Sequence, residues 1–337
     1  MLNAIWYVLL AVLFAGYAVL DGFDLGVGIL SPLAKKEEDK RVLLGAIGPV
    51  WDGNEVWLLT GGGALFAAFP LVYATVFSGL YLAMMLVLLA LILRACAIEF
   101  RGKVESNAWR ALWDRLFFSG SFLASLLFGV AVGNLMRGIP IDEAHTFTGG
   151  FFGLLNPFSI FIGVLSLVMF AMQGASYLVV KTEGELQERA ANWTLKLWMA
   201  FVLLYCGAAV WSFFEAPYLF ARYKHAVWPW AAVLLFVAAA GAMPLLLQRG
   251  RILLSFLASS ASIVALIAVL AIGAFPFLAR SSTNQDFSLT AYNASSTPYT
   301  LKWMLILALI GVPIVLAYTA YIYTVFKGKV RLEEEGY

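Results

Sequence analysis

Long apolar runs separated by short polar stretches dominate the pattern of the chain. Most of these runs hold roughly 20 residues or more, which is enough for an α-helix to cross a hydrocarbon core of roughly 30 Å. The pattern predicts nine membrane-spanning helices, over residues 4–33, 43–69, 71–97, 115–136, 150–180, 192–214, 227–247, 252–278 and 301–326. No separate soluble domain fits between them, so we predict a single polytopic membrane domain over residues 1–337.

Two connections between the predicted helices are very short. Pro70 alone separates the second helix from the third, and a turn at residues 248–251 joins the seventh to the eighth. Such short connections predict antiparallel neighbours. The first apolar run has no Lys or Arg before or within it and exceeds the apolar core of a secretory signal peptide. We therefore expect it to be retained as the first helix.

The composition agrees with an all-α integral membrane protein. Hydrophobic residues make up 62% of the chain and charged residues 12%, and the mean hydropathy is +0.87. Cys96 and Cys206 both fall within predicted helices and lack CxxC spacing, so they predict neither a disulfide nor a thiolate metal site. We expect a lipid bilayer around the chain and no nucleic-acid partner.

Most of the 22 Lys and Arg residues fall on one side of the predicted membrane. Cytoplasmic loops near span ends carry an excess of such residues. We therefore assign to the cytoplasm the loops after the first, third and fifth helices, the turn after the seventh, and the C-terminal tail. This assignment predicts an N-terminus outside and a C-terminus inside, as an odd number of spans requires.

Two pairs of carboxylates interrupt the apolar pattern. Asp21 and Asp24 lie three residues apart in the first predicted helix, and Asp52 and Glu55 have the same spacing in the second. Residues at this spacing share a helix face, so each pair can face the protein interior. Counted from the basic residues of the loop between the two helices, Asp24 and Asp52 are equally deep, roughly 16 Å from the inner boundary.

Arg94 is the predicted counter-ion of the buried acids. It lies roughly 10 Å farther into the membrane than Arg101, and ionisable groups at such depth are costly unless they are paired or hydrated. Asp114, at the start of the fourth helix, could approach Arg94 from the inner side. We therefore predict a buried ion cluster of Asp24, Arg94 and Asp114, which leaves Asp52 without a basic partner.

Two interpretations of these acids stay open. They can be structural ion pairs, because acids and a base that neutralise one another need no further function to account for their burial. An unmatched acid in lipid instead tends to take up a proton or recruit water. A proton pathway would use Asp52 first, with Glu55 and Asp21 as further members. The glycines around Asp24 lack a preceding strand, so they favour close helix packing over a nucleotide-binding loop.

Both histidines, His145 and His225, fall in predicted loops on the outer side. A transmembrane haem held by histidine requires that residue to face the core of the helix bundle. We therefore expect the chain to bind no haem and no metal ion. We also expect no catalytic residue in this chain.

Five stretches together resemble subunit II of the cytochrome bd-type quinol oxidases, and they occur in the order found in that family. They are LDGFDLGVGIL at 20–30, GPVWDGNEVWLLTGGGALFAAFP at 48–70, GNLMRGIP at 133–140, LLNPF at 154–158 and SLTAYNASSTPYTLKWM at 288–304. The most specific is WDGN followed by VWL. The chain departs from longer relatives at 215–227, where the outer connection is short.

The resemblance implies nine transmembrane helices arranged as two four-helix bundles plus one peripheral helix, in a bacterial or archaeal cytoplasmic membrane. The expected partner is a haem-bearing subunit I, which carries haems b558, b595 and d and the quinol-oxidising loop. The complex would oxidise quinol and reduce oxygen to water in an electrogenic reaction that draws its protons from the cytoplasm. A structural quinone in this chain and a small accessory subunit are further expectations, without assigned residues.

The resemblance also implies roles for single residues. In the family the aspartate of WDGN, here Asp52, lies beside the proton path that leads to the haem site at the subunit interface. Asp24, Arg94 and Asp114 fall at positions where the family has acidic and basic residues. Two other classes of function compete with this one. A proton- or cation-coupled transporter would favour an inverted repeat and broken helices, and a purely structural scaffold would only stabilise a catalytic partner.

Overall fold

The structure, a computed structural model, describes residues 1–330, which are mostly helical. The helices are α1 (Leu2–Leu30), α2 (Glu37–Ile47), α3 (Trp51–Ala68), α4 (Pro70–Gly79), α5 (Tyr81–Phe100), α6 (Asn107–Arg137), α7 (Pro157–Lys181), α8 (Gly184–Glu215), α9 (Ala221–His225), α10 (Trp230–Gln248), α11 (Ile252–Ala274) and α12 (Pro298–Val325). Two short strands, β1 (Phe277–Ala279) and β2 (Leu289–Thr290), pair antiparallel.

Eight of these helices are long and apolar enough to cross a membrane, counted within residues 1–330. They are α1, α5, α6, α7, α8, α10, α11 and α12. These eight correspond to eight of the nine predicted spans. The remaining predicted span, over residues 43–69, has a different structure.

The prediction of one helix over residues 43–69 is wrong. The chain forms α2 up to Ile47, a turn at 48–50, and then α3 from Trp51. Pro49 lies in this turn, where it has no backbone N–H to donate, and the backbone leaves the helical region at Val50, at φ −128° and ψ −22°. The span predicted over 71–97 is also divided, because α4 and α5 meet at Leu80, whose backbone leaves the helical region at φ −96° and ψ 22°.

Side-chain caps and prolines set the starts of three helices. Ser106, Asn156 and Thr297 directly precede α6, α7 and α12, and each side chain accepts a hydrogen bond from a backbone N–H of the first turn. Pro157 and Pro298 occupy the first helical positions, where the missing N–H has no consequence. These signals start α7 at residue 157 rather than at 150, and α12 at 298 rather than at 301.

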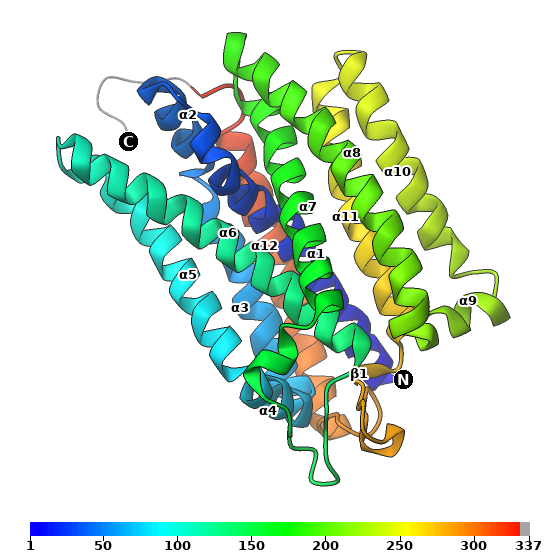
Figure 1. Ribbon diagram of the computed structural model, residues 1–337. Coiled ribbons are helices and arrows are strands. Elements are labelled where there is room, and N and C mark those ends of the chain that lie inside the picture. Colours follow the sequence, from blue (N-terminus) through cyan, green and yellow to red (C-terminus); the bar gives the residue numbers. More distant parts are fainter. Residues whose placement is uncertain (331–337) are drawn as a thin grey trace.

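α1 and α7 form the centre of the molecule (Figure 1). In this view α5 and α6 lie on one side of the pair, and α8, α10 and α11 lie on the other. α7 is the most buried of the spanning helices, whereas α12 lies almost entirely on the surface. The chain therefore has a well-packed centre and a peripheral last helix.

The backbones of α1 and α7 touch at two glycines. A Cβ atom built on Gly26 would overlap the carbonyl oxygen of Phe170, and one built on Gly174 would overlap the backbone of Gly26. Neither position has room for a side chain, so both must be glycine for the helices to approach this closely. The contact fixes α1 against α7, while Asp21 and Asp24 on other sides of α1 bind Arg94 of α5 and Asn54 of α3.

The two ends of the helix bundle differ in charge. One end, called here the basic end, joins the start of α2 to the starts of α6 and α8 through ion pairs of Lys36, Lys40, Arg101 and Arg189. The other, called the N-terminal end, holds the start of α1 and a cap built on β1 and β2. The structure thus gathers at one end the basic loops that the sequence assigned to one side of the membrane.

Candidate functional site

Three neighbouring helices place charged side chains in the apolar interior. Asp21 and Asp24 of α1 and Arg94 of α5 are fully buried, each with 0% relative exposure. Glu55 of α3 joins them with a side chain that is 24% exposed. The spacing of Asp21 and Asp24 puts both on the buried face of α1, as predicted. We call Asp21, Asp24, Glu55 and Arg94 the buried ionic cluster.

Arg94 pairs with Asp21 and Glu55. Its Nη2 atom donates to Asp21 Oδ1 at 2.7 Å and also to Glu55 Oε1. The prediction that Arg94 pairs with Asp24 and Asp114 is therefore wrong. The reason is helical register, because Asp21 lies about 4.5 Å farther from the basic end of α1 than Asp24 does. That difference of nearly one turn brings Asp21, and not Asp24, to the guanidinium.

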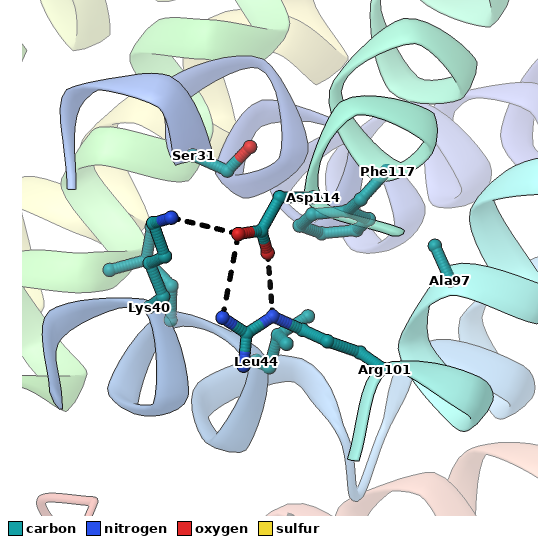
Figure 2. Close-up of a pocket in the computed structure, with 8 residues that line it drawn as sticks. Ser31, Lys40, Leu44, Ala97, Arg101, Asp114 and Phe117 are labelled. Carbon is teal, nitrogen blue, oxygen red and sulfur yellow. Dashed lines mark hydrogen bonds and ion pairs between the residues drawn. The ribbon is translucent and has the colours of Figure 1, made fainter. Parts of the chain in front are cut away.

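Asp114 belongs to a separate cluster at the basic end (Figure 2). Its carboxylate lies between Arg101 and Lys40, accepting hydrogen bonds from Arg101 Nε at 2.6 Å and Lys40 Nζ at 2.8 Å. Arg101 also pairs with Glu37 at 2.9 Å. The cavity beside these groups has a volume of about 10 Å³, about the space of one water molecule. We call Glu37, Lys40, Arg101 and Asp114 the basic-end cluster, and it ties α2 to α5 and α6.

A second, more exposed set of contacts links α2 and its loop to α8. Lys36 and Glu185 pair at 2.8 Å with side chains that are largely exposed, and the hydrogen bond to Glu185 raises the pKa of Lys36. Exposed pairs of this kind contribute little to stability. Arg189 and Asp39 pair at 2.6 Å in a more buried setting. The less exposed ion pair of Arg189 and Asp39 therefore contributes more than Lys36–Glu185 to holding α2 against α8.

Asn54 and Tyr323 are members of the site that the sequence did not predict. Asn54 is 2% exposed, and its Nδ2 atom donates to Asp24 Oδ2 at 2.7 Å. The hydroxyl of Tyr323, near the basic end of α12, donates to Asn54 Oδ1 at 3.0 Å. The amide in the WDGN motif, set in an apolar helix, was the available signal for Asn54. Tyr323 carried no signal, because its distance from Asn54 in sequence is 269 residues.

Several polar atoms around the buried ionic cluster have no protein partner within residues 1–330. They are Asp21 Oδ2, Asp24 Oδ1, Arg94 Nε, Arg94 Nη1, Tyr17 Oη and Ser121 Oγ. Buried polar groups are normally satisfied by protein or by ordered water, so such a concentration requires an explanation. Two carboxyl groups here share one guanidinium, and a third, that of Asp24, lies close by with only Asn54 as a donor. The arrangement is chemically suited to exchange a proton or to hold water in the interior.

Asp52 lies apart from this cluster, on the exposed side of α3. It forms no ion pair or hydrogen bond in the part of the chain that the structure describes. Asp52 stands in the first turn of α3, where a negative charge is favoured by the helix dipole. Three large apolar side chains that follow it on α3 are also exposed: Val56, Leu59 and Phe66. The expectation that Asp52 faces the interior together with Glu55 is thus wrong for this chain taken alone.

The depth argument that matched Asp24 with Asp52 is also corrected by the structure. It assumed a continuous helix over 43–69, and the turn at 48–50 shifts the register. The residue level with Asp24 is Asn54, to which it is hydrogen-bonded. Asp52 lies about 3 Å nearer the basic end than Asn54 along the axis of α3.

The sequence matches one protein family over nearly its whole length. The model of the family described as cytochrome bd terminal oxidase subunit II matches residues 2–326. The chain belongs to this family. A subunit II implies a partner subunit I, and together with the eight apolar helices it makes the chain a multi-pass membrane protein of a respiratory oxidoreductase complex.

Curated relatives agree over their full lengths. Subunit 2 of the cytochrome bd-I ubiquinol oxidase of Escherichia coli strain K12 is 37% identical over 364 residues, which cover 99% of this chain and 96% of the relative. Subunit 2 of the cytochrome bd ubiquinol oxidase of Bacillus subtilis strain 168 is 37% identical over 337 residues, covering 99% and 98%. The resemblance that the five sequence stretches indicated is confirmed.

A solved structure shares the fold. The bd oxidase from Geobacillus thermodenitrificans matches with a TM-score of 0.78 over 96% of this chain and 98% of that chain, at 16% identity. Within this subunit II fold both histidines lie at the N-terminal end. His145 follows α6, with Nδ1 3.3 Å from the carbonyl oxygen of Phe287, and His225 ends α9 in an exposed position. Residues 1–330 contain no group of three His, Cys, Asp or Glu that could hold a metal ion.

Proposed function

We propose that the chain is the haem-free subunit of a quinol:oxygen oxidoreductase. It supports a haem-bearing subunit I, which carries haems b558, b595 and d, and it helps to deliver cytoplasmic protons for the reduction of oxygen to water. Membership of the subunit II family supports the first part. The buried ionic cluster, in which three carboxyl groups lie together and two of them pair with Arg94, is the observation that carries the second.

The proposed path uses acids on both sides of α3. Asp52 is exposed where a partner subunit can reach it, and Glu55, one turn farther along, is held by Arg94. Asp21 is held by the same guanidinium. A proton taken up near the basic end would pass through hydrated acids at Asp52 and Glu55 toward the partner. Arg94 positions Glu55 and Asp21 and keeps their charge tolerable in the membrane interior.

The proposal extends to arrangement and orientation. We take α3 as the ninth span, with α12 as the peripheral helix outside two four-helix bundles. At 18 residues α3 is about 27 Å long, close to the hydrocarbon thickness. The basic end faces the cytoplasm and the N-terminal end faces outward, because basic residues gather at the former. A structural quinone and a small accessory subunit stay within the proposal without assigned residues.

Replacing Asp52 by Asn tests the proton role. The change keeps the shape of the side chain and removes its ability to take up a proton. We expect oxygen consumption by the purified complex to fall on the order of tenfold or more, with haem content and assembly unchanged. Asp286→Asn, at an exposed site at the N-terminal end, is the matched control and should retain the full rate.

A structural scaffold is the second candidate function. The position of Asp52 in the first turn of α3 favours it, because a carboxylate there stabilises the helix without any role in proton transfer. Full oxygen consumption by Asp52→Asn together with normal haem content would support the scaffold. Proton- or cation-coupled transport is disfavoured by the match to an oxidase family.

A further inference from the structure

An apolar groove runs along the N-terminal half of α1. Its volume is about 630 Å³, within the roughly 300–1,000 Å³ typical of small-molecule sites. α1 and α11 form its walls, and Trp57 of α3 lies at its inner end, packed against Gly16. Arg222 and Trp228 line the opposite end. The groove is separate from the buried ionic cluster and from the basic-end cluster.

The groove has the length of one lipid leaflet. Its lining on α1 runs from Ala4 to Gly16, a rise of about 18 Å, against about 15 Å for half of a hydrocarbon core of roughly 30 Å. Val8 and Val12 are 57% and 53% exposed, so this wall is open to the side, where lipid chains lie. An extended hydrocarbon chain fits this shape better than a compact ligand does.

Arg222 supplies the one charged side chain in the lining of the groove. One side of its guanidinium is fixed, because Nη2 donates to the carbonyl oxygen of Phe275 at 3.2 Å and the group stacks 5.0 Å from the Phe275 ring centre. Its Nε is buried with no partner, and no carboxylate within residues 1–330 pairs with it. The guanidinium therefore lacks a counter-ion at the N-terminal end of an apolar channel.

We propose that the groove holds one acyl chain of a phospholipid, with its phosphate bound by Arg222. Arginine suits phosphate because its planar group donates charge-assisted hydrogen bonds. Trp228 beside it is a residue type favoured at membrane interfaces. A neutral quinone head would leave the charge of Arg222 unmatched, and the Tyr7 hydroxyl, which lines the groove, already donates to Ala271. The lipid comes from the leaflet on the N-terminal side.

Lipid extracted from the intact oxidase complex tests the proposal. The complex is washed extensively in detergent, and bound phospholipid and quinone are counted by mass spectrometry of the organic extract. We expect the wild-type complex to retain one phospholipid that Arg222→Gln loses by about tenfold or more, the scale of a hydrogen bond to a charged group. Lys224→Gln is the matched control, because Lys224 lies two residues away and contacts the ring of Phe213. It should retain the lipid.

A second variant fills the groove without changing charge. Ala11→Phe should also displace the phospholipid, and phosphatidylglycerol added in nanodiscs should restore binding to wild type but to neither variant. Haem absorption and melting temperature show that each complex is folded. Equal phospholipid in wild type, Arg222→Gln and Ala11→Phe overturns the proposal. So does the loss of a quinone, rather than a phospholipid, from Ala11→Phe.

Discussion

Arg94 is the residue on which the buried ionic cluster depends. It is fully buried and holds Asp21 and Glu55 from two different helices. Its removal leaves two carboxylates without a counter-charge in a region where ionisable groups are expensive. Asp24 is less dependent on it, because Asn54 donates to that carboxylate. The arginine therefore joins α1, α3 and α5 through charge.

Arg94→Ala should cost on the order of 3–5 kcal/mol, the range for breaking a buried pair by removing one partner. The measurement is the yield and melting temperature of the assembled complex. Arg94→Lys, which keeps a positive charge but loses the planar guanidinium whose Nη2 atom donates to both acids, should fall between the alanine variant and wild type. A yield and melting temperature that match wild type in Arg94→Ala would contradict the cluster.

Tyr323 supports Asn54, and through it Asp24. Tyr323→Phe removes the donor to Asn54 Oδ1, which should lower stability by about 1 kcal/mol. If Asp24 must be held in one orientation for proton delivery, the oxygen consumption rate falls as well. Tyr321→Phe on the exposed face of α12 is the control. Equal melting temperatures of the two variants would argue against a positioning role for Tyr323.

The sequence predicted which residues are buried together better than it predicted their partners. Asp21, Asp24 and Arg94 were correctly expected in the interior, because apolar context and spacing are local signals. Arg94 was paired with the wrong acid on α1, since Asp21 and Asp24 differ in depth by only about 4.5 Å. The positions of basic loop residues do not determine the depth of a helix residue to within one helical turn. Asn54 and Tyr323 meet only in the folded chain.

At the scale of elements, the apolar pattern predicted helices well and breaks within them poorly. The spans that became α1, α10, α11 and α12 agree with the pattern closely at both ends, whereas α6, α7 and α8 begin at residues 107, 157 and 184 rather than at 115, 150 and 192. The break between α2 and α3 depends on one proline, Pro49, within a run that is otherwise hydrophobic enough to continue. A hydropathy average over the run barely changes with a single proline, so it does not indicate that Pro49 lacks a backbone N–H for the helix. The basic-end cluster then fastens the separated α2 to α5 and α6.

The glycine contact between α1 and α7 determines how close these helices come. Gly26→Ala forces a methyl group against the backbone of α7, which should cost about 1–3 kcal/mol, as overpacking does. Gly241→Ala on α10 is the matched control, because its added Cβ would meet nothing within 4 Å. The measurement is the melting temperature of the complex. Equal values for the two variants would show that the helices can separate without loss.

At the scale of the whole molecule, the exposed surface is largely apolar, and different parts of it have different uses. Large side chains such as Leu59 of α3, Leu89 of α5 and Leu307 of α12 are about half exposed or more. Lipid and a partner subunit both suit such surfaces. The face of α3 also carries Asp52, an ionisable residue that is costly to expose to lipid. This combination favours α3 as part of the contact with subunit I.

The complex purified through this chain should carry haem absorption and oxidise quinol, whereas the chain purified alone should show neither. The reason is that both histidines lie at the N-terminal end, away from the helix core, His145 in a loop and His225 at the end of α9. An ultraviolet-visible spectrum and an oxygen-electrode assay of the two samples make the comparison. Haem absorption that stays with the isolated chain would contradict the proposed division of labour.

The exposed position of Asp52 has a consequence for how cells handle the unassembled chain. Without a partner, this carboxylate faces the bilayer, at a cost below the roughly 2.5–3.5 kcal/mol of a charge at the membrane centre. In the proposed contact of α3 with subunit I, docking removes that cost. A surplus copy of the chain is therefore the less stable form, and quality-control proteases that sample partly unfolded proteins would remove it first. On this proposal, one acidic side chain helps to match the amounts of the two subunits.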